Sequence, residues 1–152
     1  MKPSTAKRVR ETYTALADRT PQMVEAFYRR VFAARPDLVA IFPPDMSRLQ
    51  GHFGAALALI ARNVERIDAL EQPLMSMGAR HLGYGVKYED YPIVGEALLA
   101  TLEEFAGVLW TPEVAAAWKD VVSAVSAAML RGAAVAAWES ERPLRGQRRS
   151  AP

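Results

Sequence analysis

The chain has no cysteine and only two histidines among its 152 residues. The lack of cysteine excludes disulfides, thiolate metal sites and thiol catalysis, and it permits a reducing compartment, so we expect a cytoplasmic protein. No run of about 18 apolar residues occurs, so no membrane-spanning segment is predicted. The first residues are not followed by an apolar segment, and we expect no signal peptide.

The motifs of several enzyme classes are also missing. The sequence has no Gly-x-Ser-x-Gly nucleophile elbow, no phosphate-binding loop and no dinucleotide fingerprint. The sequence offers few ligands for a metal site built from protein residues alone, because there is no HExxH motif and no Glu-x-x-His pair. No segment alternates apolar and polar residues as a strand would, and no internal repeat is present.

Every long segment has the apolar period of an α-helix, and the sequence predicts an all-α protein. Apolar residues make up 51% and charged residues 24%, which is the range of a globular domain. The predicted helices begin near residues 4, 20, 37, 45, 69, 91 and 111. Thr111-Pro112-Glu113 is a strong start signal, Asp45 is expected to cap a helix that reaches about Glu65, and the last helix is expected to reach about Trp138.

The net charge of +2 is unevenly distributed. Residues 142–152 hold Arg142, Arg145, Arg148 and Arg149 and no acid, so the remainder of the chain has a net charge of −2. We predict one domain over residues 1–139 and a basic, disordered tail over residues 140–152. Such a tail can contact nucleic acid or anionic lipid, but a solvated tail is preferred, and we expect neither nucleic acid nor a membrane as partner.

His81 is placed on the apolar side of a predicted helix, where it shares one face with Leu74 and Met77. An imidazole among apolar side chains needs a partner, because an unpaired buried polar group costs about 1–3 kcal/mol. One interpretation is a core histidine that a protein group satisfies. The other is a ligand to a cofactor that brings its other ligands with it, as haem does when it takes one axial imidazole.

Six ordered blocks give the chain a family resemblance over about residues 5–135. They are Phe27-Tyr28-x-x-Val31-Phe32, Arg35-Pro36-x-Leu38-x-x-Ile41-Phe42-Pro43, Asn63-Val64-Glu65, Gly78-x-Arg80-His81-x-x-Tyr84-Gly85-Val86, Tyr91-Pro92-Ile93-Val94-Gly95-x-x-Leu98-Leu99 and Trp110-Thr111-Pro112-Glu113 with Ala117-Trp118. In these blocks the chain resembles the globins, specifically the bacterial single-domain globins related to flavohaemoglobins and to neuroglobin.

The resemblance implies a globin fold, a 3-over-3 helical sandwich around a haem pocket, and haem b (iron protoporphyrin IX) as cofactor. A separate D helix is expected to be absent or minimal, because only seven residues lead from Phe42 to Leu49. By resemblance, His81 is the proximal iron ligand through Nε2, and its other nitrogen donates to a backbone carbonyl. Phe42 packs on the haem, and the hydroxyl of Tyr28 faces the sixth coordination position.

The resemblance also places residues around the rest of the pocket. Leu49 falls at the distal position, which is usually His or Gln, and Phe53 lies one turn further on. A register shifted by one would make Gln50 distal, but Gly54 would then replace Phe53, so we prefer Leu49. The remaining lining residues are expected to be Met77, Val86, Tyr91, Val94, Leu98 and Met129. Arg80 and Lys87 lie near a propionate or are solvated.

Two further positions decide between functions. His52 is either a surface residue that contacts a propionate or a second axial ligand to the iron. Ala133 stands where flavohaemoglobins have a proximal glutamate, so nitric oxide dioxygenase-like activity is less favoured and would need an external reductase.

The main hypothesis is a haem protein that reversibly binds O2, NO, CO or a similar diatomic gas, with Tyr28 as the distal donor. The alternative is a six-coordinate haem sensor or electron-transfer module that uses His81 and His52. A third hypothesis is a globin fold that has lost haem and serves as an interaction domain, which the presence of His81 and Phe42 disfavours. The oligomeric state stays open.

Overall fold

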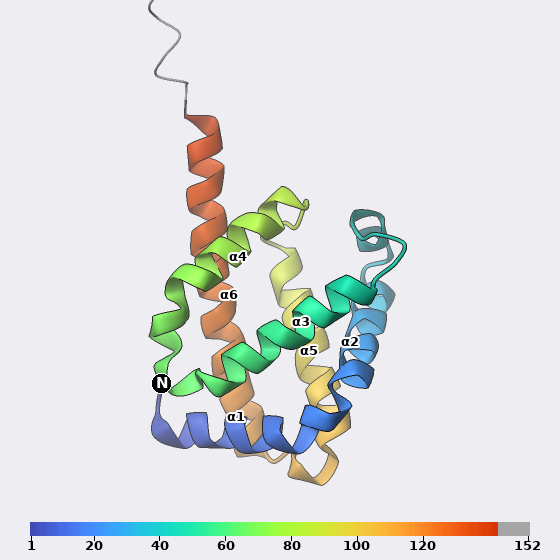
Figure 1. The fold of residues 1–152 in the computed structure, drawn as a ribbon, viewed down its shortest axis with the longest axis vertical. Helices are drawn as coiled ribbons and strands as arrows, with labels where there is room; N and C mark the ends of the chain where they lie inside the picture. Colours follow the sequence, from blue (N-terminus) through green and yellow to red (C-terminus); the bar gives the residue numbers. More distant parts are fainter. Residues whose placement is uncertain (143–152) are drawn as a thin grey trace, which may run out of the picture.

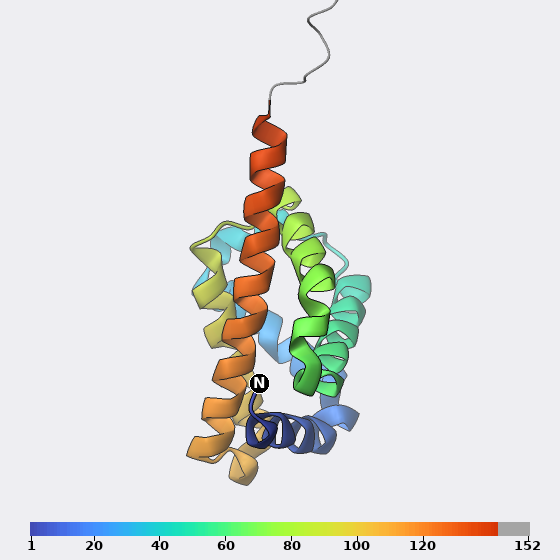
Figure 2. The same cartoon turned by 90° about the vertical axis from the view of Figure 1, so that its left-hand side faces the viewer.

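The computed structural model describes residues 1–142, and this part of the chain is helical without a strand. Its elements are α1 (Pro3–Leu16), η1 (Ala17–Arg19), α2 (Thr20–Ala34), η2 (Pro36–Ile41), α3 (Ser47–Arg62), η3 (Val64–Leu70), α4 (Glu71–Gly83), α5 (Asp90–Ala106), η4 (Gly107–Leu109) and α6 (Pro112–Glu141), where η marks a 3-10 helix. Figure 1 shows α1 across one end of the molecule, and Figure 2 shows α3 and α4 on one side with α5 and α6 on the other. The predicted all-α class is confirmed.

The connection from η2 to α3 contains no helix, which agrees with the expected absence of a D helix. The carboxylate of Asp45 accepts hydrogen bonds from the backbone nitrogen of Ser47 at 3.0 Å and from its hydroxyl at 2.7 Å. These bonds hold the pKa of Asp45 below its usual value. Asp45 therefore supports the start of α3, although Met46 and not Asp45 occupies the N-cap position.

Helix α3 ends at Arg62, three residues before the predicted end. The side-chain amide of Asn63 donates to the carbonyl of Leu59 at 2.8 Å, and the backbone of Asn63 leaves helical angles with ψ at 15°. The chain continues as η3, with a further break at Arg66. A side-chain amide that hydrogen-bonds to a carbonyl of its own helix competes with the backbone hydrogen bonds that would continue the helix. This competition explains why α3 ends early. By contrast, the Thr111 cap of α6 is confirmed, since its hydroxyl accepts from the nitrogen of Val114 at 3.2 Å.

Two glycines let α4 and α6 touch backbone to backbone. A Cβ added to Gly78 would lie 1.8 Å from the carbonyl oxygen of Met129, and one added to Gly132 would lie 1.9 Å from that of Met75. No other residue fits at either position without moving a helix. Arg131 also makes two hydrogen bonds of 2.7 Å to the carboxylate of Glu71. These contacts fix the position of α4, the helix that carries His81.

The apolar core has two parts. The larger is built around α1, the second half of α3, and α6, with Trp118, Leu16 and Leu102 among its most buried side chains. The smaller joins α2, η2 and α5; its fully buried members are Val24, Phe27, Tyr28, Val31, Leu38 and Ala97. The half-buried Leu98 packs against both parts, so α5 links them.

Helix α6 is long and apolar enough, by length and composition alone, to cross a membrane. This departs from the prediction that no segment would qualify. One such helix is weak evidence for a membrane span. Only 17% of the apolar window of α6 is buried, although Trp118 and Val121 of this helix lie in the core. The helix extends to Glu141, past the predicted domain boundary at residue 139, and the rest of the predicted tail, residues 143–152, lies outside the described residues.

Candidate functional site: the pocket between α3 and α4

His81 lies near the end of α4, and one of its ring nitrogens makes a hydrogen bond. Its Nδ1 is 2.7 Å from the backbone carbonyl oxygen of Met77, one helical turn earlier. A carbonyl oxygen only accepts, so Nδ1 carries the proton and Nε2 presents its lone pair. This is the hydrogen bond that the sequence predicted. The bond fixes the orientation of the imidazole, as a hydrogen bond to the nitrogen that does not bind the metal does in a metal-binding histidine.

The imidazole is neutral at physiological pH. Half-burial of His81 lowers its pKa below the usual value because the charged form would lose hydration, and the nearby charge of Arg80 acts in the same direction. The hydrogen bond to Met77 opposes both effects without reversing them. A neutral imidazole is the form that binds metal ions.

The segment after α4 folds back over its end. Gly85 adopts a φ of 96°, which favours glycine, and the nitrogen of Val86 donates to the carbonyl of His81 at 3.0 Å. A Cβ on Gly85 would lie 3.7 Å from Cγ2 of Ile41, so this segment approaches η2. Val86 is half-buried beside the helix end, whereas Arg80 and Lys87 are exposed.

Aromatic side chains from α2, from α3 and from the residue after η2 meet in one cluster. The ring centroid of Tyr28 lies 5.7 Å from that of Phe42 and 5.8 Å from that of Phe53, both in edge-on geometry. Phe53 also stacks on Phe27 at 4.5 Å. Burial raises the pKa of Tyr28 to about 12, so its hydroxyl keeps its proton and can donate a hydrogen bond.

Helix α3 presents Leu49 and Phe53, one turn apart, to this aromatic group. Both are half-buried and pack against the smaller core, as Met46 does. Gly54 also faces α2, because a Cβ there would lie 3.2 Å from Cγ2 of Thr20. The register with Leu49 and Phe53 in the pocket, in place of Gln50 and Gly54, stays a prediction. His52 is exposed on the same helix.

Helix α5 supplies the remaining wall. Val94 and Leu98 pack against the smaller core. The hydroxyl of Tyr91 is buried and has no hydrogen-bond partner among residues 1–142, and burial raises its pKa. A buried hydroxyl without a partner is unfavourable, so it marks a place where a further polar group fits. Met129 packs against the larger core beneath α4.

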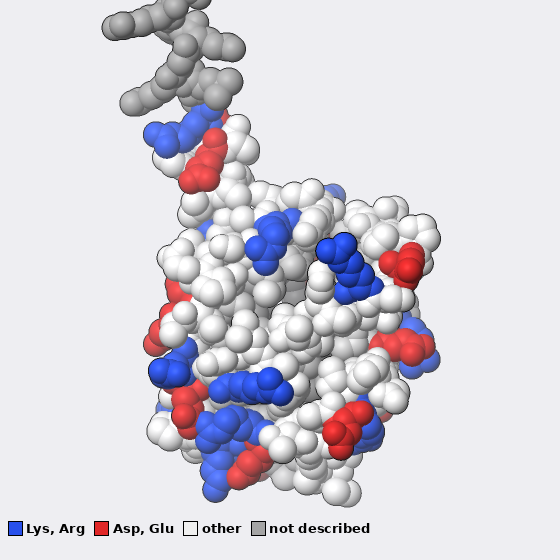
Figure 3. Space-filling view, in the orientation of Figure 1, with Lys and Arg blue, Asp and Glu red and all other residues white. Residues whose placement is uncertain are grey.

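Figure 1 shows a gap between α3 and α4 with α5 and α6 behind it. In the space-filling view of the same face, the surface is hollowed between these helices and basic side chains lie at the rim (Figure 3). The predicted residues thus divide into two groups. Tyr28, Phe42, Leu49, Phe53, Val94 and Leu98 belong to one apolar cluster, while Met77, His81 and Val86 lie on α4 and the segment that follows it.

The sequence analysis missed Asp90, the first residue of α5. It is 1% exposed, and its carboxylate accepts from Arg35 at 2.9 Å and from the backbone nitrogen of Lys87 at 2.9 Å. Arg35 also makes hydrogen bonds of 2.9 and 2.7 Å to Asp37. The position of an acid just before Tyr91-Pro92, at a helix start, was the available signal.

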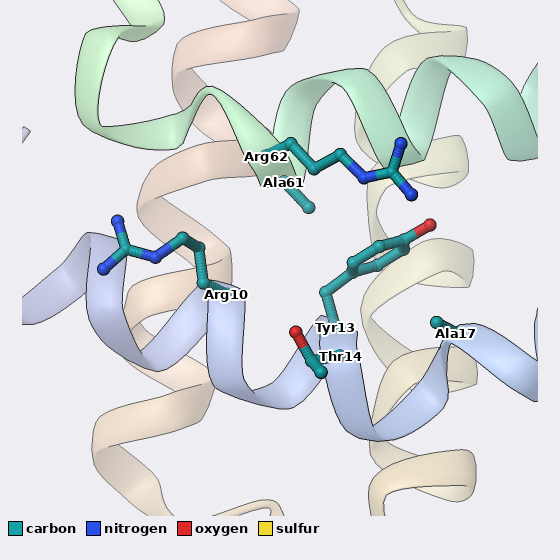
Figure 4. A pocket seen from close by; sticks show the side chains of 6 residues that line it. All are labelled: Arg10, Tyr13, Thr14, Ala17, Ala61 and Arg62. Atoms are coloured by element: carbon teal, nitrogen blue, oxygen red, sulfur yellow. The ribbon is translucent and has the colours of Figure 1, made fainter.

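A separate cleft lies between α1 and α3 and includes none of these residues. It is lined by Arg10, Tyr13, Thr14, Ala17, Ala61 and Arg62. Figure 4 shows the guanidinium groups of Arg10 and Arg62 pointing to opposite ends of it. Arg10 is paired with Glu65, so its charge is compensated.

Comparisons with known proteins agree on the class. The family model described as Globin matches residues 25–129. A flavohemoprotein of Rhizobium meliloti is 34% identical over 113 residues, and one of Halalkalibacterium halodurans is 29% identical over 126 residues. These matches cover 72% and 80% of this chain but only 28% and 30% of those proteins, so the chain spans less than a third of their length.

Two solved structures share the fold. An engineered carbene transferase built on a candidate nitric oxide dioxygenase from Rhodothermus marinus superposes with a TM-score of 0.80 at 25% identity, covering 93% of this chain and 99% of that one. A bacterial globin from Campylobacter jejuni gives 0.73 at 17% identity, covering 93% and 100%.

The order of helices, with His81 on α4 and an aromatic cluster around Tyr28 on α2, and the solved structures that share this arrangement define the class of fold. The chain belongs to the globin family. The predicted family and fold are therefore confirmed, and membership implies binding of haem and of a small gas ligand.

Proposed function

We propose that this globin binds haem b through Nε2 of His81 and uses the opposite face for a diatomic gas, with dioxygen as the main candidate. The observation that carries the proposal is the hydrogen bond from His81 Nδ1 to Met77, because it leaves Nε2 as the ring nitrogen with a free lone pair. Haem supplies an iron centre at which such a gas binds reversibly.

The residues present fit this cofactor. An apolar macrocycle needs apolar walls, and half-buried side chains from α3, α5 and two loops supply them: Phe42, Leu49, Phe53, Val86, Val94 and Leu98. The buried hydroxyl of Tyr91 lacks a partner on the α5 wall, so the site has one unused polar group. Exposed Arg80 and Lys87 are cations suited to the carboxylates at the rim of a haem.

Tyr28 is the proposed distal donor. Its hydroxyl is protonated at any physiological pH, and three aromatic neighbours, Phe27, Phe42 and Phe53, hold its ring. A polar gas ligand gains about 1–2 kcal/mol from one such hydrogen bond. Leu49 has no donor, so it excludes water from the same face and leaves Tyr28 as the hydrogen-bonding group.

Nitric oxide chemistry is a secondary activity in this proposal. By the family resemblance, Ala133 on α6 takes the position at which flavohaemoglobins have a glutamate, so no carboxylate is expected there to make the imidazole of His81 more basic. Nitric oxide turnover would also require electrons from a reductase, which the flavohemoprotein name of the relatives suggests as the kind of partner. We therefore propose gas binding as the principal function and slow nitric oxide turnover with an added reductase.

The six-coordinate alternative finds little support in the structure. His52 is exposed, so it would have to rotate inward to become a ligand. In the ferrous protein without gas, five-coordination is expected, and His52→Ala should leave the absorption spectrum unchanged. Sharp, split visible bands that disappear in His52→Ala would favour the alternative.

Titration of the purified full chain with haemin tests the function. We expect a saturable Soret band at one haem per chain, and after reduction a spectrum that shifts with carbon monoxide or dioxygen and returns when the gas is removed. A chain that gives no Soret band, or a ferrous form that does not respond to either gas, would contradict the proposal.

A further inference from the structure

The cleft between α1 and α3 is open because small side chains line it from both sides. Ala61 on α3 is fully buried, and Ala17, which follows α1, is half-buried. Neither side chain extends beyond its Cβ, and the elements leave a volume of about 260 Å³ between them. Pockets for drug-sized ligands have about 300–1,000 Å³, so a ligand of this cleft is smaller than that class.

The charged side chains that line the cleft are both arginines, and no acid lines it. Glu65, which is not part of the lining, pairs with Arg10. Arg62 is exposed and forms no ion pair with any residue of 1–142. The cleft therefore contains one cation whose charge the described part of the chain does not compensate, and this cation is Arg62.

Tyr13 adds a hydrogen-bond donor to the end of the cleft that holds this cation. In Figure 4 the hydroxyl of Tyr13 and the guanidinium group of Arg62 point to the same end. Tyr13 is 8% exposed and belongs to the larger core, so its ring is fixed by packing. Arg10, Tyr13 and Ala17 are spaced three and four residues apart, so α1 and the residue after it present them on one face.

We propose that this cleft binds a small carboxylate with an apolar body, of about the size of benzoate. The planar guanidinium group of Arg62 matches a carboxylate with two parallel N–H donors, and the hydroxyl of Tyr13 can donate a further hydrogen bond. The methyl groups of Ala17 and Ala61 contact the apolar body. Inorganic phosphate is less suited, because it has no apolar part and the cleft has one uncompensated cation.

An NMR titration of the full, haem-loaded chain tests the proposal, with carbon monoxide on the ferrous haem to keep the probe away from the iron. Benzoate should bind at one site with a dissociation constant on the order of 1 mM and shift the amide resonances of α1 and of the end of α3. Acetate lacks the ring and benzyl alcohol lacks the charge, so each should bind at least about tenfold more weakly. Arg62→Gln should weaken benzoate binding about tenfold, and Tyr13→Phe about threefold.

Arg48→Gln is the matched control, because Arg48 is exposed in the first turn of α3, roughly 21 Å along the helix from Arg62. This variant should bind benzoate as the wild type does. Three results would overturn the proposal: no saturable shift with benzoate, equal affinity for benzoate and either acetate or benzyl alcohol, or a loss in Arg62→Gln no larger than in Arg48→Gln. The cleft shares no residue with the proposed haem site, so a failed haemin titration would refute gas binding without bearing on this site.

Discussion

Arg35 and Asp90 join the two sides of the site. Nη1 of Arg35 donates to Oδ1 of Asp90 at 2.9 Å, although 55 residues separate them in the chain. Through Arg35 the pair reaches the start of η2, which leads to Phe42, and through the nitrogen of Lys87 it reaches the segment that follows α4. One ion pair thus ties the aromatic wall to the loop beside His81.

Replacing Asp90 by Ala should destabilise the domain by about 3 kcal/mol, because it leaves Arg35 without its buried partner. It should also speed haem loss, since the backbone nitrogen of Lys87, next to Val86, loses its hydrogen bond to the carboxylate of Asp90. Urea unfolding and transfer of haem to an acceptor protein measure the two effects. Glu104→Ala is the control, because its pair with Arg30 is half-exposed and should contribute no more than about 1 kcal/mol. Equal effects of the two changes would contradict the role assigned to Asp90.

The glycine contact between α4 and α6 predicts a large effect from a small change. Gly132→Ala places a methyl group 1.9 Å from the carbonyl oxygen of Met75, so the helices must separate, at a cost of about 3 kcal/mol or more. Gly51→Ala is the matched control, because nothing lies within 4 Å of its added Cβ and alanine favours the helix by about 0.5–1 kcal/mol. In thermal unfolding, the midpoint temperature should fall for Gly132→Ala and rise for Gly51→Ala. An unchanged midpoint temperature in Gly132→Ala would show that the helices are not held this closely.

The pair of Glu71 and Arg131 predicts an acid-sensitive contribution to stability. The hydrogen bonds from Arg131 hold the pKa of Glu71 below 4.5, so the carboxylate stabilises the folded state above that pH. The contribution is lost as the pH falls from 4.5 through the lower folded-state pKa. Glu71→Gln should therefore flatten the decline of stability in this range and leave its shape at higher pH unchanged. An identical acid profile for both proteins would contradict the assignment.

Tyr28 predicts a change in gas kinetics without a change in haem retention. Tyr28→Phe keeps the ring and its aromatic contacts but removes the donor, so dioxygen should dissociate about 5–30-fold faster. Stopped-flow mixing of the oxygenated protein with dithionite or carbon monoxide measures this rate. Tyr13→Phe, on α1 in the larger core, should leave the rate as it was. An unchanged rate in Tyr28→Phe would mean that another group faces the ligand.

Local patterns in the sequence predicted the elements better than the contacts between them. Apolar periodicity located the helices, and the family resemblance predicted the bond from His81 to a carbonyl. The end of α3 was misplaced because Asn63 competes for its own helix carbonyls, a local effect that periodicity does not show. The Arg35–Asp90 pair was missed because it joins distant segments, and no spacing rule within one sequence reveals such a contact.

The close contacts of Gly78 and Gly132 were not predicted for a similar reason. Gly132 was placed within the last predicted helix without a packing partner, and Gly78 entered only as part of a family block. Their reciprocal approach to Met75 and Met129 depends on the crossing of two helices. A crossing point follows from three-dimensional packing, so it becomes visible only in the structure.

Replacing the side chain of His81 while supplying imidazole from solution tests most directly whether Nε2 of His81 holds the haem. His81→Gly, titrated with haemin, should give weak haem binding and an altered Soret band, and added imidazole should restore both toward the wild-type spectrum. Glycine leaves room for the free imidazole, so the rescue separates loss of a ligand from loss of the fold. Full haem retention in His81→Gly without imidazole, with an unchanged spectrum, would contradict the account.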